Sequence, residues 1–154
     1  MEYTLRSVTK DDMWVIFHWR NHPESKLNSF SSHSIDQTTH AVWFKNRITR
    51  ISKEPFYILE QKIQVAVCRF DISPAWAKTF DVSILVNPNF QRKGIGKLTL
   101  RESCQVVFRR FPDWTIHAKV KIGNVASQRI FEANGFQIES ENMEFALYSI
   151  SPSL

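Results

Sequence analysis

Cysteine, glycine and long apolar runs are all scarce in this sequence of 154 residues. The two cysteines, Cys68 and Cys104, are isolated in apolar surroundings. They match neither a disulfide framework nor the spacing of metal ligands, so no metal is expected. No apolar run approaches the roughly 20 residues that cross a bilayer, and the amino terminus lacks the pattern of a signal peptide. We therefore expect a cytoplasmic protein with no membrane partner.

Blocks of like charge are also missing, although the net charge is +5. Basic surfaces attract polyanions, but the lysines and arginines are scattered, which argues against nucleic acid as the partner. An acidic small ligand accounts for the positive excess equally well. With 43% hydrophobic and 23% charged residues, the chain has a globular composition, and we expect one domain over residues 1–154. These features leave open whether the protein forms a homodimer.

The order of apolar patterns predicts an α+β fold. Strands are expected at residues 3–8, 56–60, 64–72, 79–86, 115–120 and 143–150. Helices are expected at about residues 9–20, 34–48, 96–111 and 125–134. The second helix is predicted to begin with a capping box at Ser34–Gln37. The serine-rich stretch 25–33 is predicted to form a loop.

Only four glycines occur, and two of them, Gly94 and Gly96, lie between a predicted strand and a predicted helix. Because glycine weakens regular structure, we interpret this pair as a place where main-chain N–H groups approach a ligand closely. A helix that begins at about Gly96 or Lys97 adds free N–H groups and the positive end of its dipole. Arg92 and Lys93 add charge. The segment predicts an anion site, with a plain strand-to-helix turn as the alternative.

Two common nucleotide-binding motifs are excluded at this loop. A dinucleotide fingerprint requires glycine at position 99, which is Thr99. A phosphate-binding loop of the NTPase type requires glycine at position 91 and serine or threonine at position 98, which are Gln91 and Leu98. The anion would therefore belong to another kind of ligand.

The residues around the loop carry a family resemblance. The segment Ile84–Phe90 forms a predicted strand end, a proline turn and an aromatic residue, and the segments Asn124–Ser127 and Phe131–Phe136 follow downstream. Across Thr79–Phe136 the chain resembles the GNAT acetyltransferase superfamily. The resemblance implies an acetyl-CoA-dependent N-acetyltransferase. It also implies a mixed central sheet of six to seven strands with about four helices, splayed between the fourth and fifth strands.

The resemblance implies a specific arrangement of acetyl-CoA. The main chain at Leu85 and Val86 would pair with the pantetheine amides as an added strand does. Asn124 and Ser127 would line the pantetheine and cysteamine end, although Asn124 also suits a helix cap. The pyrophosphate would be held by the N–H groups of Gln91, Arg92, Lys93, Gly94, Ile95, Gly96 and Lys97.

The resemblance also indicates candidate catalytic residues. Attack on the thioester requires a neutral amine, so a base must take the proton of the ammonium group. Asp81 aligns with a carboxylate that acts as the base in many relatives, and His117 on the neighbouring strand is a second candidate. The resemblance also implies that Phe131 contacts acetyl-CoA, at a position where many relatives carry a tyrosine that protonates the departing thiolate. Ser127, water or no group would replace it, and a catalytically silent acyl-CoA-binding module is an alternative.

The amino-terminal helices are expected to hold the acceptor. They resemble those of a subgroup that acetylates 4-amino sugars on nucleotides in the pseudaminic-acid pathway, and also those of ribosomal-protein N-terminal acetyltransferases. Arg20 suits a diphosphate because its guanidinium binds two oxygens. The other candidate acceptor-binding residues are Asn21, His22, Trp43 and Phe44, and Phe30 and His40 belong to the same resemblance. The aromatic residues are open to the alternative of simple core packing. A nucleotide-linked amino sugar is the first hypothesis and a peptide α-amine, held in an acidic groove, the second.

Overall fold

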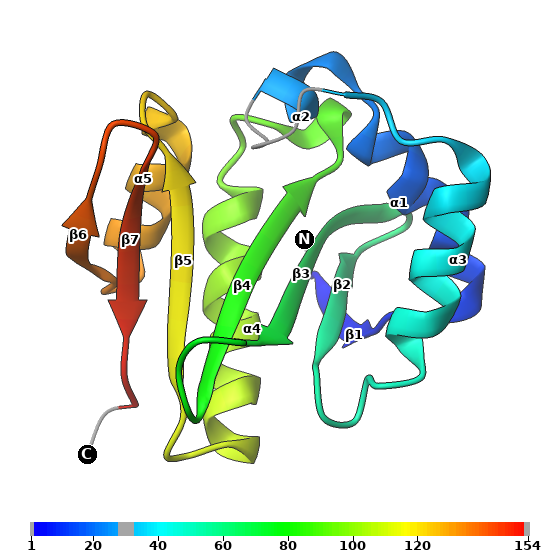
Figure 1. Cartoon of the computed structure of the whole chain (residues 1–154). Coiled ribbons are helices and arrows are strands. Elements are labelled where there is room, and N and C mark those ends of the chain that lie inside the picture. Colours follow the sequence, from blue (N-terminus) through cyan, green and yellow to red (C-terminus); the bar gives the residue numbers. More distant parts are fainter. Residues whose placement is uncertain (1, 28–32, 153–154) are drawn as a thin grey trace.

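The computed structural model describes residues 2–27 and 33–152. A mixed sheet of seven strands runs through the molecule in the order β1-β2-β3-β4-β5-β7-β6 (Figure 1). The strands are β1 (Thr4–Ser7), β2 (Phe56–Glu60), β3 (Gln64–Ile72), β4 (Thr79–Val86), β5 (Thr115–Lys121), β6 (Gln137–Glu141) and β7 (Phe145–Ile150). All neighbouring pairs are antiparallel except β4 and β5, which run parallel.

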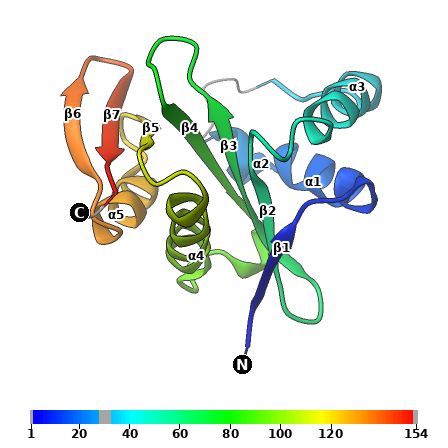
Figure 2. The same cartoon turned by 90° about the horizontal axis from the view of Figure 1, so that it is seen from below.

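The helices lie on both faces of this sheet (Figure 2). They are α1 (Met13–Arg20), α2 (Pro23–Leu27), α3 (Gln37–Ile48), α4 (Ile95–Arg110) and α5 (Val125–Ala133), with short 3-10 turns at Lys10–Asp12 and Pro88–Phe90. Helices α4 and α5 cover one face, and α1 to α3 lie on the other (Figure 2). In the described part of the chain, no helix combines the length and the apolar character that crossing a membrane requires.

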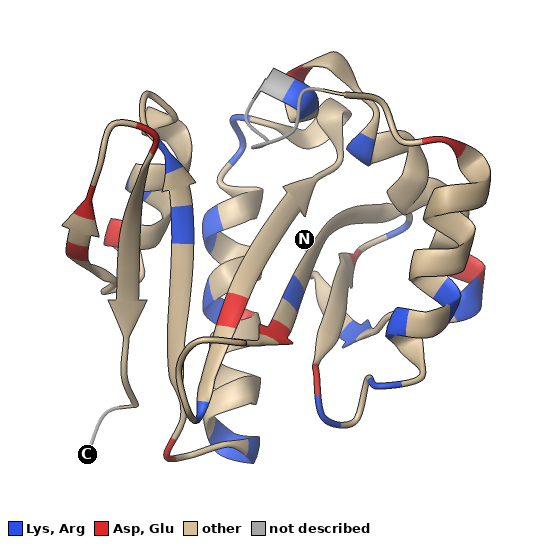
Figure 3. Ribbon diagram, in the orientation of Figure 1, with Lys and Arg blue, Asp and Glu red and all other residues tan. Residues whose placement is uncertain are grey.

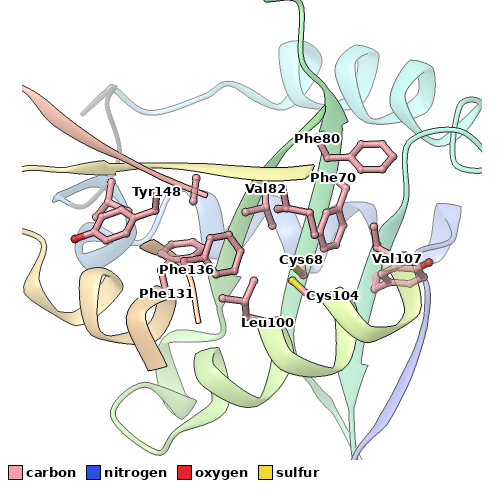
Figure 4. Close-up of a cluster of buried hydrophobic side chains, with 14 of the residues drawn as sticks. Cys68, Phe70, Phe80, Val82, Leu100, Cys104, Val107, Phe131, Phe136 and Tyr148 are labelled. Carbon is pink, nitrogen blue, oxygen red and sulfur yellow. The ribbon is translucent and has the colours of Figure 1, made fainter. Parts of the chain in front are cut away.

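The main core fills the space between the sheet and helices α4 and α5 (Figure 4). Alternate residues of β5, Ile116, Ala118 and Val120, point into this core. Their neighbours along the strand therefore face the opposite side, because successive side chains of a strand alternate. A second core, built around Ile16, Trp19 and Phe44, joins α1 and α3 to the other face. Both cysteines are buried, as free thiols.

Strands β4 and β5 separate soon after they pair. Their register contains only three residue pairs, from Thr79 opposite Thr115 to Asp81 opposite His117. Beyond Asp81, β4 has β3 as its partner on one side and no strand pairing on the side of β5. The predicted fold, a mixed sheet splayed between the fourth and fifth strands, is confirmed.

Several local predictions are wrong. Residues 25–27 of the predicted loop 25–33 belong to helix α2, since Pro23 suits a first helical turn; residues 28–32 lie outside the described part. Helix α3 is capped by Asp36, whose side chain accepts from the Thr39 N–H, rather than by Ser34. Strand β6 was not predicted, because all five of its side chains are exposed and leave no alternating apolar pattern.

Candidate active site

The gap between β4 and β5 exposes one edge of β4. From Val82 to Val86 the strand pairs with β3 alone, so main-chain groups on its other edge lack strand partners. An unpaired strand edge accepts an extended amide-containing ligand as an additional strand. Leu85 and Val86, the predicted pantetheine contacts, lie at the open end of this edge and are half-buried. The structure therefore places them where such a ligand has access.

The glycine loop joins this edge to the start of helix α4. Arg92 and Gly94 have positive φ angles of 63° and 76°, and Gly94 is the N-cap of the helix, without a side-chain cap. The first main-chain bond of the helix runs from the Leu98 N–H to the Gly94 carbonyl, at 3.1 Å, so the N–H groups of residues 95–97 precede the first donor of the helix. Unsatisfied N–H groups at a helix start form a site for an anion such as phosphate. The helix begins at Ile95, slightly earlier than predicted.

Gly96 has a different structural reason from the one inferred for it. A Cβ at this position would lie 2.8 Å from Ile130 Cδ1 and 3.5 Å from Val86 Cγ2. Gly96 therefore lets the first turn of α4 pack closely against α5 and the end of β4. At Gly94 a Cβ would meet no atom within 4 Å, but its positive φ favours glycine.

Helix α5 begins beside the same gap with an asparagine cap. Asn124 Oδ1 accepts from the Ser127 N–H at 3.2 Å, and Asn124 Nδ2 donates to Ser127 Oγ at 3.0 Å. The helix-cap alternative for Asn124 is thus observed. Both side chains stay half-buried, and their contact with acetyl-CoA remains a prediction.

Phe131 lies in the core. Its side chain is 6% exposed and packs against Phe136, with ring centroids 5.1 Å apart, and against Tyr148 at 6.4 Å (Figure 4). The Tyr148 hydroxyl donates to Glu132 Oε1, on the exposed side of α5. A contact between Phe131 and acetyl-CoA stays a prediction.

Asp81 and His117 form the last residue pair before the two strands separate. Both side chains project from the face opposite α4 and α5, since their neighbours Val82 and Ile116 point into the core. Asp81 makes no hydrogen bond or ion pair with the described residues. Partial burial raises the pKa of its carboxyl, and Asp71 adds to the rise, whereas His117 acts in the opposite direction. A carboxylate with a raised pKa beside the gap is suited to accept a proton.

On the same face, the ring of Trp43, from α3, contacts two arginines. The guanidinium carbon of Arg20 is 4.6 Å from the Trp43 ring centroid, and that of Arg69, from β3, is 5.0 Å from it. Arg20 Nη1 donates to His40 Nδ1 at 3.1 Å, and His40 Nε2 donates to the Met13 carbonyl at 2.8 Å. Burial lowers the His40 pKa, as does Arg20, which agrees with a neutral ring that holds Arg20 in place.

The region around Trp43 contains more arginines than carboxylates. Asp71 accepts from buried Arg47 at 2.8 Å and from Arg69 at 2.9 Å. Arg20 has no carboxylate partner among the described residues. Burial, and secondarily the charge of Arg69, lower the pKa of Arg20 to about 10. Figure 3 shows charges of both signs on β3 and β4 next to the α1–α3 side. An anionic ligand would compensate Arg20.

The other predicted acceptor residues have different roles. Phe44 is fully buried in the second core, so the prediction that it contacts a substrate is wrong. Both polar atoms of the Asn21 side chain bind the main chain of Ile35, at 2.8 Å each. His22 Nδ1 accepts from the Glu24 N–H at the start of α2. Phe30 lies outside the described residues.

Sequence reasoning missed Arg69 and Asp71. Both lie in strand β3, whose apolar pattern gave no reason to single them out. The register of β3 on β4 places Arg69 opposite Ser83 and Asp71 opposite Asp81. Only that pairing shows that the two residues belong to the candidate site.

Together, the splayed strands, the free N–H groups at the start of α4 and the carboxylate at the apex of the gap define a transferase site for a thioester with a phosphate-bearing carrier. The family comparison agrees. A model of the acetyltransferase (GNAT) domain matches residues 3–137, and the chain belongs to this family. The protein is therefore an acetyl-CoA-dependent N-acetyltransferase, as predicted from its glycine loop and downstream signature.

Similar proteins include members of the two predicted subgroups. The acetyltransferase PseH of Campylobacter jejuni subsp. jejuni is 25% identical over 139 residues, which cover 90% of this chain and 85% of that protein. The solved structure of Campylobacter jejuni PseH in complex with acetyl coenzyme A has a TM-score of 0.73 at 20% identity, and covers 99% of this chain and 100% of that one. A ribosomal-protein-alanine N-acetyltransferase from Brucella melitensis has a TM-score of 0.81 at 17% identity, with coverages of 96% and 99%.

Proposed function

We propose that this enzyme acetylates the amino group of a nucleotide-linked amino sugar, with the 4-amino group as the acceptor position. The observation that carries the proposal is the pair of guanidinium groups, Arg20 and Arg69, on the ring of Trp43. Arg20 is half-buried without a carboxylate partner among the described residues, so the pair suits the diphosphate of a nucleotide. The resemblance to PseH supports the same class of acceptor.

Acetyl-CoA would be held on the opposite side of the gap. The N–H groups of the loop from Gln91 and of the first turn of α4 suit its pyrophosphate, and the open edge of β4 suits the amides of its pantetheine arm. Asn124 and Ser127 lie where α5 begins and would line this arm. The arm would then bring the thioester to the apex of the gap, where Asp81 and His117 are paired.

The transfer itself follows from the position of Asp81. Asp81 accepts a proton from the ammonium group of the acceptor, directly or through water, with His117 as the second candidate base. The neutral amine attacks the thioester carbonyl, a C–N bond forms, the C–S bond breaks, and the nitrogen releases its second proton to water. Coenzyme A leaves as a thiolate that gains a proton from water. The side chain of Phe131 offers no proton, so the proposal assigns it no acid role.

Peptide acetylation is the alternative within the same family. That activity was predicted to use an acidic groove. Instead, the face beside Trp43 carries an excess of guanidinium groups, because Asp71 is already shared by Arg47 and Arg69. The charge balance therefore favours an anionic acceptor over a peptide with a cationic amino terminus.

Release of free thiol from acetyl-CoA tests the proposal across a panel of acceptors. The panel contains a UDP-linked 4-amino sugar, the same sugar without its nucleotide, and peptides with free amino termini. We expect the highest kcat/KM for the nucleotide-linked sugar. Arg20→Met should raise the KM for that sugar but not for acetyl-CoA, while Arg109→Met, at the exposed end of α4, should change neither. A peptide with the highest kcat/KM, unaffected by Arg20→Met, would refute the proposal.

A further inference from the structure

A hollow of about 430 Å³ lies beside His117, on the sheet face opposite α4 and α5. Its walls come from the β3–β4 loop and from strands β5, β6 and β7. The lining combines one aromatic ring, Trp76, with the hydroxyls of Thr115 and Ser149 and the carboxylate of Glu139. Because His117 also pairs with Asp81, the hollow adjoins the candidate catalytic pair.

Trp76 stands out because it is held in place although much of its ring is exposed. Its side chain is 58% exposed. The loop that carries it is fixed by Ser73 Oγ, which accepts from the N–H groups of Ala75 and Trp76 at 3.2 Å each. Its ring makes an edge-to-face contact with His117, at 5.8 Å between centroids. Trp76 therefore offers an ordered aromatic surface to a ligand in the hollow.

The polar groups around this ring are suited to hydroxyl groups rather than to a strong charge. Ser149 lies opposite His117 on β7, and its hydroxyl donates to Glu139 Oε1. Thr115 Oγ1, at the start of β5, and Ser151 Oγ, directly after the end of β7, are 3.4 Å apart. Hydroxyls and a carboxylate exchange hydrogen bonds with sugar hydroxyls, while the aromatic ring covers the apolar C–H face of the sugar.

The distance from the arginine pair to the hollow fits one bound molecule. Arg69 lies opposite Ser83 on β4, two residues from Asp81, which is itself opposite His117 on β5. Two strand spacings and two residues along a strand place the Cα atoms of Arg69 and His117 about 12 Å apart. A diphosphate at Arg69 would therefore bring an attached ring to His117.

We propose that the hollow binds the ring that carries the reacting amine, an amino-substituted pyranose, with its apolar face against Trp76 and its hydroxyls toward Thr115, Ser149 and Glu139. This inference rests on the proposed function and names the subsite that selects the sugar. Trp76 acts here as a binding and specificity residue, because it contacts the ring beside the reacting amine.

Kinetics of Trp76→Ala test the subsite. We expect the KM for the amino sugar to rise about tenfold, as loss of an aromatic contact would cause, with the KM for acetyl-CoA unchanged. Trp76→Phe should keep most of the affinity. Ser151→Phe fills the hollow from the opposite wall and should raise the same KM with Trp76 intact. Ile72→Ala is the control, since Ile72 is also exposed, at 44%, and lies outside the hollow lining.

Binding of the free amino sugar, followed by saturation-transfer NMR, separates this inference from the proposed function. If the free sugar binds in a Trp76-dependent manner while the nucleotide-linked form is no substrate, the subsite is supported and the proposal that the acceptor carries a nucleotide is wrong. If the nucleotide-linked sugar is the best substrate and neither Trp76→Ala nor Ser151→Phe changes its KM, the subsite is wrong and the proposed function stands. If only peptides react and both variants are neutral, both proposals fail.

Discussion

Replacement of Arg20 by methionine should cost the fold little while removing acceptor binding. Burial and the charge of Arg69 lower the pKa of Arg20 to about 10, which at about 1.4 kcal/mol per pKa unit limits the cost of this charge to about 3 kcal/mol. Solvent screening of a partly exposed group reduces that value to about 1 kcal/mol. Removing the charge therefore stabilises the fold by this amount, whereas losing the cation–π contact with Trp43 destabilises it by about 1 kcal/mol. Loss of the hydrogen bond from Arg20 Nη1 to His40 Nδ1 adds about 1 kcal/mol. Because the first two terms nearly cancel, we expect the free energy of unfolding to fall by only about 1 kcal/mol.

Arg47 provides a matched control, because it is a buried arginine with complete compensation. It is 1% exposed, pairs with Asp71, and donates to the carbonyls of Glu54, Pro55 and Phe70. Removing one partner of a buried ion pair costs about 3–5 kcal/mol, so Arg47→Met should be strongly destabilised. The contrast depends on the anionic partner and the three main-chain carbonyls that Arg47 has and Arg20 lacks.

Urea unfolding at pH 7 gives the free energy of unfolding of both variants. Thermal shifts in the presence of UDP report the binding of the nucleoside diphosphate. A nucleoside diphosphate at 100 times its Kd should stabilise the wild type by about 2.7 kcal/mol and leave Arg20→Met nearly unchanged. Equal destabilisation by Arg20→Met and Arg47→Met would show that Arg20 is a structural residue. An undiminished thermal shift in Arg20→Met would show that the diphosphate binds elsewhere.

Three further predictions concern the donor site and the base. Asp81→Asn should lower kcat about 100-fold at neutral pH with an unchanged acetyl-CoA KM, as loss of a general base does. Since burial raises the Asp81 pKa, wild-type kcat/KM should fall as the pH drops through that raised value, and this acid limb should vanish in Asp81→Asn; a retained limb would point to His117. Gly94→Glu should weaken acetyl-CoA binding, as measured by calorimetry. Gly135→Ala, strained by a similar φ of 85°, should not weaken it. If Gly94→Glu bound acetyl-CoA as tightly as the wild type, the pyrophosphate would lie elsewhere. Gly96→Val should destabilise the fold by about 1–3 kcal/mol through its contact with Ile130 Cδ1, and Ile130→Ala should recover part of this loss in a double-mutant cycle.

The donor half of the site was the more predictable half, because its determinants are local. Gly94 and the proline turn at Pro88 act on the main chain of adjacent residues, and the start of α4 follows directly in the sequence. Free N–H groups at a helix start need no distant partner. Even here the reason for Gly96 depended on tertiary structure, since Ile130, which excludes a side chain at this position, belongs to another helix.

Apolar patterns and a short glycine motif were sufficient to predict the α+β class, most of the strands, the family and the acetyl donor. The construction of the acceptor face became clear only from strand pairing and helix packing. The register of β3, β4 and β5 aligns Asp71, Asp81 and His117, and helix packing brings Arg20 and Arg69 onto Trp43. Those residues are far apart in the chain, and their common location depends on strand pairing and packing, which local patterns do not encode.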